Sequence, residues 1–471
     1  MARLIGLDIG TSSAKAVAID EKGTLLGIAS REYPLSVPQP GWAEQNPDDW
    51  WHAAEACLAE LKADQADAIG LTGQMHGSVF LDSEDQVIRP ALLWCDQRTS
   101  AECAEIESRV GPEKLRQITG NPALTGFQLP KVLWLRNNEP AAFSRLSSVL
   151  LPKDYIRLKM TGLKLTEVSD ASGIGALDVR KRAWSPEVLA ALDLPSSFFP
   201  DVVESREQTG TWRGVPVVGG GGDQAAAAVG TGAVTPGLVS VSLGTSGVVF
   251  EAFDQMPSSQ TDAIHDFCHA TGAWHRMGVM ISCGGAVRWC RDTFYPEGYD
   301  AMNRDAEASG VGAGGVLFAP YLSGERCPYV DPFVRGGFTG LALNHTRGDM
   351  ARAVFEGVTF GLKGCLDLMN PGVAPQRVRV TGGGAKSRLW VQMLADVLGC
   401  PCQLLTSDEG PAYGAAILGG LSAGVWKDVV EASEAAVQVR EEVNPSGLDY
   451  SQGYQAFSAL YPLLSALKPS R

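Results

Sequence analysis

The chemistry that this sequence could perform centres first on Asp223. It follows four consecutive glycines, residues 219–222, and is followed directly by Gln224. Four glycines leave little bulk beside the carboxylate, so a hydroxyl group of a ligand can come close. We therefore interpret Asp223 as a general base that takes a proton from such a hydroxyl. The alternative is an ordinary helix N-cap, which does not require four glycines.

A second aspartate, Asp8, precedes Gly10-Thr11-Ser12 in a tight turn between two predicted strands. Backbone N–H groups of such a turn can face an anion. Asp8 repels a phosphate directly, but it can hold Mg²⁺, which in turn binds the phosphate. Lys15 can reach the same negative charge. The alternative is a plain hairpin whose turn is stabilised by Asp8.

The Gly-Thr-Ser run occurs again about half a chain later, as Gly244-Thr245-Ser246. It again lies between two predicted strands, over residues 238–243 and 248–252. Two such turns in the same context indicate a duplicated domain with two loops that face phosphates.

Two further turns carry candidate ligand-binding residues. Met75 and His76 follow a predicted strand over residues 68–72, and strand ends are where α/β sheets bind ligands. His76 can hydrogen-bond a hydroxyl, and Met75 can lie against a carbon chain; the alternative is a loop histidine without a ligand. The turn with Gly383, Gly384 and Ser387 resembles an anion nest or a surface for a flat ring, and it lacks the P-loop arrangement.

Strands and helices must position these turns. Apolar patterning predicts a meander of strands over residues 4–8, 15–20 and 25–30. Asn46 and the proline after it predict a helix start, and Asp349 is expected to cap a later helix. The pattern predicts an α/β fold that ends in a helical tail after about residue 430.

Length and composition limit the function classes. A chain of 471 residues predicts at least two domains, which the repeat divides into residues 1–234 and 235–471. The net charge of -14 disfavours a nucleic-acid partner. The ten scattered cysteines form no CxxC pair, and Asp8 interrupts any secretory leader, which predicts a cytoplasmic protein without a membrane segment.

Taken together, these motifs resemble those of the FGGY carbohydrate kinases, and among them most closely the xylulokinase group. The resemblance spans roughly residues 3–430. The segments that carry it are LDIGTSSAKAVAID (7–20), EQNPDDWW (44–51), GLTGQMHG (70–77), GGGGDQAAAAVG (219–230), SLGTSG (242–247), YLSGERCPYVDPFVRGGFTGL (321–341) and TGGGAKSRLWVQMLADVLG (381–399).

The resemblance implies two actin-like (ribonuclease H-like) α/β domains that close on a cleft. The N-terminal domain would bind a sugar and the C-terminal domain ATP. The implied reaction is the Mg²⁺-dependent phosphorylation of D-xylulose by ATP to D-xylulose 5-phosphate, in xylose metabolism. The implied partner is a small sugar, with a homodimer as an open alternative.

The resemblance also implies a role for each of the candidate residues. Catalysis would rest on Asp223, as general base, and on Asp8, as metal ligand. The sugar would contact Met75, His76, Asp223 and Gln224. The nucleotide would contact Gly10, Thr11, Ser12, Lys15, Gly244, Thr245, Ser246, Gly383, Gly384 and Ser387.

Several alternatives stay open. Gln128 stands where a small hydroxyl residue or proline is usual in the family, and Cys327 and Tyr329 stand where threonine and histidine are frequent in xylulokinases. The sugar or polyol could therefore be ribulose, gluconate or erythritol. A rival from another class is an actin-like ATPase that binds partner proteins, which would not need a base facing a sugar. An acyl-transfer hydrolase is disfavoured because there is no GxSxG motif.

Overall fold

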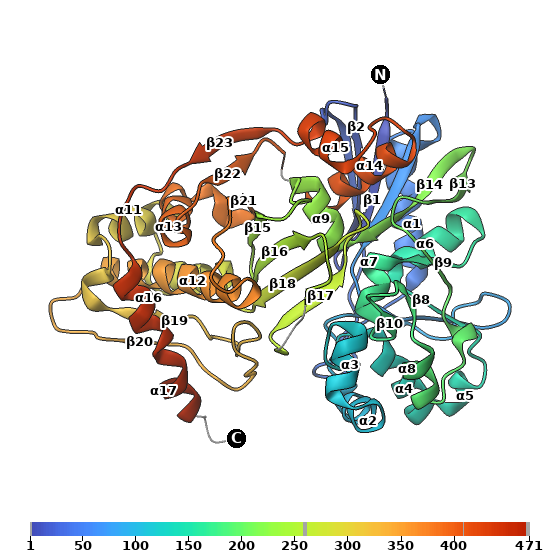
Figure 1. The fold of residues 1–471 in the computed structure, drawn as a ribbon, viewed down its shortest axis with the longest axis horizontal. Helices are drawn as coiled ribbons and strands as arrows, with labels where there is room; N and C mark the ends of the chain where they lie inside the picture. Colours follow the sequence, from blue (N-terminus) through green and yellow to red (C-terminus); the bar gives the residue numbers. More distant parts are fainter. Residues whose placement is uncertain (1, 258–260, 408, 468–471) are drawn as a thin grey trace.

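The computed structural model describes residues 2–257, 261–407 and 409–467 and contains two large β-sheets, each flanked by helices (Figure 1). The first sheet comes from the N-terminal half, in the order β13-β14-β5-β1-β2-β3. Its strands are β1 (Leu4–Ile9), β2 (Ser13–Ile19), β3 (Leu25–Glu32), β5 (Ala68–Gly73), β13 (Gln208–Trp212) and β14 (Val215–Gly222).

The predicted meander and the first helix are confirmed. β1, β2 and β3 pair antiparallel in sequence, as the alternating apolar residues predict. Helix α1 (Pro47–Glu60) starts after Asn46, whose side chain accepts a hydrogen bond from the Asp48 N–H. Its apolar face, which includes Trp50 and Leu58, is buried against the sheet.

The second sheet repeats the arrangement of the first. In each, a hairpin strand pairs antiparallel with its successor and parallel with a later strand: β1 with β2 and β5, β15 with β16 and β21. The order is β17-β18-β16-β15-β21-β22-β23. These strands are β15 (Leu238–Leu243), β16 (Gly247–Phe253), β17 (Ile264–Cys268), β18 (Trp274–Met280), β21 (Arg377–Thr381), β22 (Cys402–Leu405) and β23 (Val439–Val443).

Most of the remaining N-terminal half is an insertion between β5 and β13, drawn in cyan to green in Figure 1. It contains helices α2 (Ser100–Val110), α3 (Pro112–Thr119), α4 (Gln128–Asn138), α5 (Pro140–Phe143), α6 (Pro152–Thr161), α7 (Val168–Ala171) and α8 (Pro186–Ala191). Short strand pairs are β6 (Val79–Leu81) with β8 (Ser148–Leu150), β9 (Leu165–Glu167) with β12 (Asp201–Val203), β10 (Leu177–Asp178) with β11 (Ala183–Trp184), and β7 (Ala91–Leu92) with β4 (Glu44–Gln45), which precedes β5.

Helices of the second half complete the fold. They are α10 (Gly284–Phe294), α11 (Tyr299–Ser309), α12 (Arg347–Met369), α13 (Arg388–Leu398) and α14 (Gly410–Ser422), with a small pair of strands β19 (Leu317–Ala319) and β20 (Gly337–Thr339). Helix α9 (Asp223–Thr231) directly follows β14 at the end of the first half. The prediction that Asp349 caps α12 is wrong, because Thr346 is the N-cap. Asp349 is the third helical residue, and its side chain accepts from the Thr346 N–H.

Helix α14 leaves the C-terminal half and packs on the first sheet. A Cβ at Gly6 would lie 1.8 Å from the Ala412 carbonyl oxygen, and one at Gly70 would lie 1.8 Å from that of Ala415. The two glycines therefore let this helix lie directly on β1 and β5. The predicted division at residue 234 stays a prediction, and the packing of α14 crosses it.

The C-terminal tail is only partly helical, which corrects the expectation from sequence. Helices α15 (Val429–Ala436), α16 (Ser451–Ser458) and α17 (Leu460–Ala466) are present, but residues 439–443 form β23 at the edge of the second sheet. Among the described residues, every helix is too short or too polar to span a bilayer.

Candidate active site

Three predicted motifs meet at one edge of the first sheet. β14, β5 and β1 are neighbouring parallel strands, and their register aligns Gly221 with Thr72 and Thr72 with Asp8. Adjacent strands lie about 4.8 Å apart. Asp8 and Gly221 lie two strands apart and are therefore separated by roughly 10 Å across the sheet. The sheet thus brings Asp8, the loop with His76 and the start of α9 with Asp223 to the same carboxyl end.

Asp223 is the first residue of α9, and Gly222 occupies the N-cap position. The alternative interpretation of Asp223 as an N-cap side chain is therefore wrong. Burial raises the pKa of the Asp223 carboxyl from 3.8 to about 6, against the opposing effect of hydrogen bonds from the backbone and side chain of Gln224. The carboxylate is still mostly ionised near pH 7 and has the basicity that a general base needs.

Asp8 lies close enough to Asp223 for their charges to interact. Burial raises the pKa of Asp8 from 3.8 to about 7; the charge of Asp223 adds to this shift, and Lys15 opposes it. The Asp8 Oδ1 atom is buried and has no hydrogen-bond partner among the described residues. A buried carboxylate with an orphaned oxygen and a second carboxylate nearby fits a divalent cation, since a cation would stabilise both charges.

Lys15 faces Asp8 across the β1–β2 hairpin but forms its ion pair with Glu409. The Gly10 N–H donates to the Ser13 carbonyl at 3.0 Å and closes the turn. This N–H is therefore used within the hairpin and does not face an anion, contrary to expectation. A phosphate contact at Thr11 or Ser12 stays a prediction.

The hairpin turn is tied to the loop after β5 by side-chain hydrogen bonds. The Thr11 hydroxyl donates to Gln74 Oε1 at 3.1 Å and accepts from Trp94 Nε1 at 2.9 Å. Gln45 Nε2 donates to the Thr11 carbonyl at 2.7 Å. Sequence reasoning missed Trp94, which lies far from both motifs in the chain and belongs to no recognisable motif.

His76 is held as a neutral imidazole with a defined tautomer. Its Nδ1 lies 2.7 Å from the Gly173 carbonyl, which can only accept, so Nδ1 carries the proton and Nε2 is an acceptor. The ring stacks on Phe127 with centroids 4.6 Å apart. Burial lowers the pKa of His76 to about 3, so the ring is uncharged at neutral pH. Lys131 Nζ donates to the His76 carbonyl at 2.8 Å and holds the loop.

Met75 is buried against the glycine strand. A Cβ at Gly222 would lie 2.9 Å from Met75 Cγ, so the last glycine makes room for this side chain. Gln128 is buried, and its Nε2 donates to the Gly77 carbonyl at 2.8 Å. Gln128 therefore holds the backbone of the loop that contains His76. Cys327 is also buried, beside Gly278, and does not form a pocket wall.

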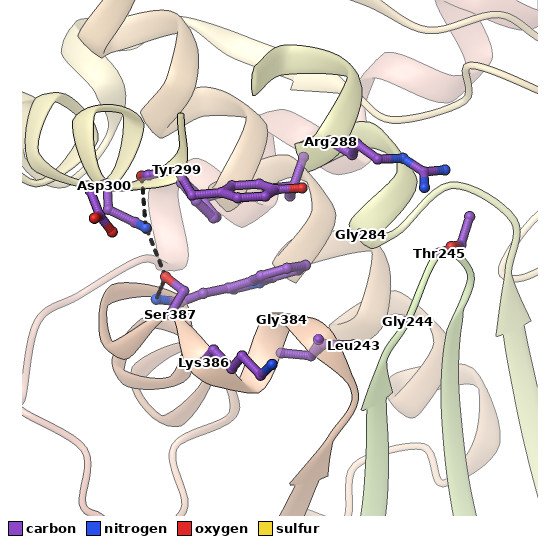
Figure 2. A pocket seen from close by; sticks show the side chains of 15 residues that line it. Leu243, Gly244, Thr245, Gly284, Arg288, Tyr299, Asp300, Gly384, Lys386 and Ser387 are labelled. Carbon is purple, nitrogen blue, oxygen red and sulfur yellow. Dashed lines mark hydrogen bonds between the residues drawn. The ribbon is translucent and has the colours of Figure 1, made fainter. Parts of the chain in front are cut away.

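A separate pocket of about 700 Å³ lies in the C-terminal half, and it contains five of the residues predicted to bind nucleotide (Figure 2). It brings the turn after β15 together with the turn after β21. Lining residues are Leu243, Gly244, Thr245, Gly284, Val287, Arg288, Tyr299, Asp300, Asn303, Phe355, Gly383, Gly384, Lys386, Ser387 and Trp390. Gly10, Thr11, Ser12, Lys15 and Ser246 do not line it.

The two glycines of the second turn have different surroundings. A Cβ at Gly384 would lie 2.5 Å from the Trp390 ring, so this glycine is required for packing. A Cβ at Gly383 would meet nothing within 4 Å. Ser387 caps α13, and its hydroxyl lies 2.8 Å from Asn303 Oδ1, which joins the turn to α11.

The pocket has an apolar slot and a polar end. Figure 2 shows Tyr299 on one wall and Gly384 with Lys386 on the facing wall, while Thr245 and Arg288 lie together toward one end. Within the described ranges, neither Arg288 nor Lys386 forms an ion pair with a carboxylate. A flat ring in the slot and an anion near these two cations would both be accommodated. Sequence reasoning missed the roles of both cations, because the sequence does not show whether an arginine or lysine is paired with a carboxylate.

Arg326, beside Cys327, is a further residue that sequence reasoning missed. It is half-buried, and its guanidinium has no ion-pair or hydrogen-bond partner in the part of the chain that the structure describes. Burial lowers the pKa of His76 and that of His265 on β17, and the charge of Arg326 adds to both shifts. His265 Nε2 is itself buried without a partner. The C-terminal half thus presents a cation and an acceptor toward His76.

Comparisons with known proteins bear on both halves. The family model for the N-terminal domain of the FGGY family of carbohydrate kinases matches residues 3–230, and that for the C-terminal domain matches residues 239–423. The chain is 41% identical over 444 residues to the xylulose kinase of Escherichia coli (strain K12), which covers 91% of each chain. It is 36% identical over 486 residues to the xylulose kinase of Lactococcus lactis subsp. lactis (strain IL1403), covering 98% of this chain and 97% of that one.

The structure is similar to solved structures over its whole length. With the xylulose kinase from Rhodospirillum rubrum the TM-score is 0.92 at 32% identity, covering 99% of each chain. This similarity includes both sheets and the insertion, so the expected two-domain α/β fold is confirmed.

Proposed function

This chain belongs to the FGGY family of carbohydrate kinases, and from that premise we propose that it transfers the γ-phosphoryl group of ATP to D-xylulose. The product would be D-xylulose 5-phosphate. The curated relatives described above support this choice of sugar. The observation that carries the proposal is the alignment of Asp8, the His76 loop and Asp223 at one sheet edge.

In the proposed reaction, Asp223 accepts the proton of the terminal sugar hydroxyl. The hydroxyl oxygen forms a bond to the γ-phosphorus while the bond from that phosphorus to the bridging oxygen breaks, which releases ADP. The transition state is loose, so positioning and charge neutralisation supply most of the acceleration. A general base typically contributes about 10²–10⁴-fold.

Asp8 would hold Mg²⁺, whose chemistry when bound is to neutralise charge on the phosphates. The orphaned Asp8 Oδ1 supports this role, as does the raised pKa of Asp8, because both identify a negative charge that lacks a counterion.

The nucleotide would occupy the pocket of the C-terminal half. The base would lie in the slot between Tyr299 and the Gly383–Gly384 turn, with the phosphates toward Thr245 and Arg288. The two unpaired cations, Arg288 and Lys386, match the charge of a nucleotide.

The sugar would lie between Asp223 and His76. The Nε2 atom of His76 would accept a hydrogen bond from a sugar hydroxyl, since its Nδ1 is committed to Gly173. The low pKa of His76 keeps this acceptor available throughout the neutral range.

One observation favours a second candidate substrate. Arg326 is an unpaired cation whose charge acts on His76, whereas it is not among the groups that shift the pKa of Asp8 or Asp223. It would therefore lie toward the end of the sugar that is not phosphorylated. A carboxylate at that end, as in gluconate, would pair with the guanidinium.

An ADP-release assay with Mg-ATP tests the proposal against D-xylulose, D-ribulose, L-ribulose, gluconate, erythritol, glycerol and no sugar. Turnover on D-xylulose well above the others is the expected result. Turnover on gluconate that is lost in Arg326→Met would establish the second candidate. ATP hydrolysis that no sugar stimulates would overturn both and favour an ATPase that binds partner proteins.

A further inference from the structure

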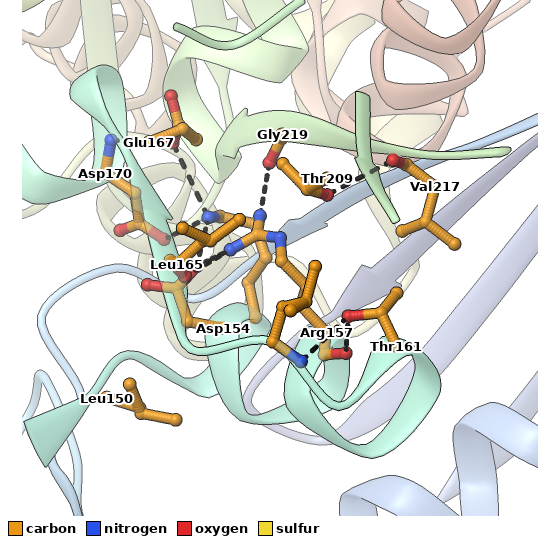
Figure 3. A network of polar contacts seen from close by, with 12 residues as sticks. Leu150, Asp154, Arg157, Thr161, Leu165, Glu167, Asp170, Thr209, Val217 and Gly219 are labelled. Carbon is orange, nitrogen blue, oxygen red and sulfur yellow. Dashed lines mark hydrogen bonds and ion pairs between the residues drawn. The ribbon is translucent and has the colours of Figure 1, made fainter. Parts of the chain in front are cut away.

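A buried ionic network lies beside the strand that directly precedes the candidate base (Figure 3). Lys153 Nζ lies 2.8 Å from Asp154 Oδ1, 3.6 Å from Glu167 Oε1 and 3.5 Å from Asp170 Oδ2. Arg157 Nη1 lies 2.5 Å from Asp154 Oδ1. All five side chains are fully buried. A buried network of this size fixes the backbone around it, because each charge must keep its partners.

The network reaches the glycine strand β14 at two points. Arg157 Nη2 donates to the Gly219 carbonyl at 2.6 Å, a contact drawn in Figure 3. At the other end of the glycine run, the Gly222 N–H donates to Ser169 Oγ at 3.1 Å. Ser169 is buried, and its hydroxyl in turn faces the Glu167 carboxylate at 2.9–3.0 Å. Glu167, which Lys153 contacts, thus orients Ser169 toward Gly222.

The glycine run needs outside support of this kind. Four residues without side chains have a wide choice of backbone conformations, and no side chain of their own limits it. Gly220 has a φ of +78°, and the pairing of β14 with β5 shifts in register between Val218 and Gly221. The conformation that starts α9 at Asp223 is therefore determined largely by what binds the backbone on either side.

We propose that Ser169, oriented by Glu167, is a positioning residue for Asp223. Its hydroxyl accepts a hydrogen bond from the N–H of Gly222, the residue immediately before Asp223. This hydrogen bond sets the direction in which the Asp223 carboxylate points. The proposal rests on the proposed function, in which Asp223 is the base. Without this acceptor the buried Gly222 N–H loses its side-chain partner, and the start of α9 shifts.

Ser205 provides a matched control for Ser169. It is equally buried, and its hydroxyl also donates to Glu167 Oε2, at 2.6 Å. Among the described residues its hydroxyl makes no hydrogen bond to the glycine strand, whereas its backbone carbonyl accepts the Gly220 N–H at 2.8 Å. Ser205→Ala therefore removes a hydrogen bond to the same carboxylate and leaves the hydrogen bond from the Gly222 N–H to Ser169 intact.

The test compares kcat, both KM values and the thermal midpoint in the wild type, Ser169→Ala and Ser205→Ala, using the sugar that the wild type phosphorylates best. We expect Ser169→Ala to lower kcat roughly ten- to a hundredfold, the size of effect that a misplacement of about 1 Å produces, with the KM for ATP unchanged. Ser205→Ala keeps the wild-type kcat. Equal losses of kcat in the two variants would overturn the proposal, because they would indicate a general structural effect.

A pH profile provides a readout that a merely structural role does not move. Looser positioning of Asp223 weakens its hydrogen bonds from Gln224, which hold its pKa down. The acid limb of kcat/KM is therefore expected to move to higher pH in Ser169→Ala and to stay in place in Ser205→Ala. If Ser169→Ala does not fold, Ser169→Cys, with a weaker acceptor, is expected to have an intermediate kcat, and an unchanged kcat would overturn the proposal.

Failure of this proposal is distinguishable from failure of the proposed function. If the wild type phosphorylates no sugar in the panel, the proposed function fails before Ser169 is tested. If the wild type is active and Asp223→Asn keeps its kcat, the assignment of the base fails. If Asp223→Asn is inactive and Ser169→Ala behaves as Ser205→Ala does, only the positioning role fails.

Discussion

Asp8 lies near the end of β1 and Asp223 directly after β14, two parallel strands separated by one strand, and burial together with the charge of Asp223 raises the pKa of Asp8. Two carboxylates that destabilise each other in a largely buried place are unfavourable for folding alone. Their arrangement is explained if a cation and a phosphate occupy the space between the strand ends. The predictions below follow from this pair and from the residues around it.

Replacement of Asp223 tests the base. We expect Asp223→Asn to lower kcat at least 100-fold, because the amide cannot take the proton of the sugar hydroxyl. Steady-state ADP release measures this. Asp49→Asn is the control, since Asp49 also lies in the first turn of a helix, α1. A kcat for Asp223→Asn within a few-fold of the wild type would rule out the base.

The pH dependence of kcat/KM reports the ionisation of the base. Asp223 must be ionised to act, and burial raises its pKa to about 6, so activity is expected to fall as the pH drops through about 6. Gln224→Ala removes one of the hydrogen bonds that lower this pKa and should move the acid limb upward. A limb that stays near the ordinary aspartate pKa in the wild type would contradict the assignment.

Asp8→Asn is expected to keep or raise the stability of the protein while it lowers the activity. Burial and Asp223 raise the pKa of Asp8 to about 7, so above that pH the ionised carboxylate destabilises the folded state, and this penalty disappears as the pH falls. Without metal or nucleotide, Asp8→Asn should therefore melt at the same or a higher temperature than the wild type at pH 8. Its kcat should be strongly reduced. Differential scanning fluorimetry with and without Mg-ATP also tests whether the variant loses stabilisation that depends on Mg²⁺.

His76 tests the sugar site. His76→Ala removes the Nε2 acceptor and should raise the KM for the sugar at least tenfold, while the KM for ATP changes less than twofold. His52, an exposed histidine of α1, provides the control variant His52→Ala, which should behave as the wild type does. Equal rises in both KM values for His76→Ala would indicate that the loop is only structural.

Lys386 tests the nucleotide pocket. Lys386→Met removes an unpaired cation from the pocket wall and should raise the KM for ATP roughly tenfold, with little change in the KM for the sugar. The effect should weaken at high salt, because the attraction between Lys386 and the negative charge of the nucleotide is screened. Lys427→Met, at an exposed lysine outside the pocket, is the control. If the two lysine variants have the same KM for ATP, the nucleotide does not contact Lys386.

Local features of the fold were predictable because they depend on neighbours in the chain. The strands of the first meander follow from alternating apolar residues, and the start of α1 follows from Asn46 and Pro47. The start of α12 was misplaced because two residues three positions apart, Thr346 and Asp349, can each cap a helix. Both take part in the capping box, and only the backbone conformation shows which one is the N-cap.

Parts of the candidate site were predictable for a similar reason. The four glycines before Asp223 and the two Gly-Thr-Ser turns are visible in the sequence, and one of these turns lines the pocket with the Gly383–Gly384 turn. The roles of Arg288, Lys386 and Arg326 were not predictable, because nothing in the sequence shows whether a given cation is paired with a carboxylate. Its significance comes from having no carboxylate partner within the described part of the fold, which depends on distant segments.

The repeated hairpins, the glycine turns and the family of this protein were therefore predictable from the order of amino acids, since they are encoded in short runs of residues. That Asp8, Thr72 and Gly221 share one level of the sheet becomes visible in the folded chain alone, because strand register depends on pairing between segments far apart in the chain. Only the tertiary structure, likewise, pairs Lys15 with Glu409 and keeps His76 neutral between Gly173 and Phe127. Charge and protonation depend on burial and on the partners that folding supplies.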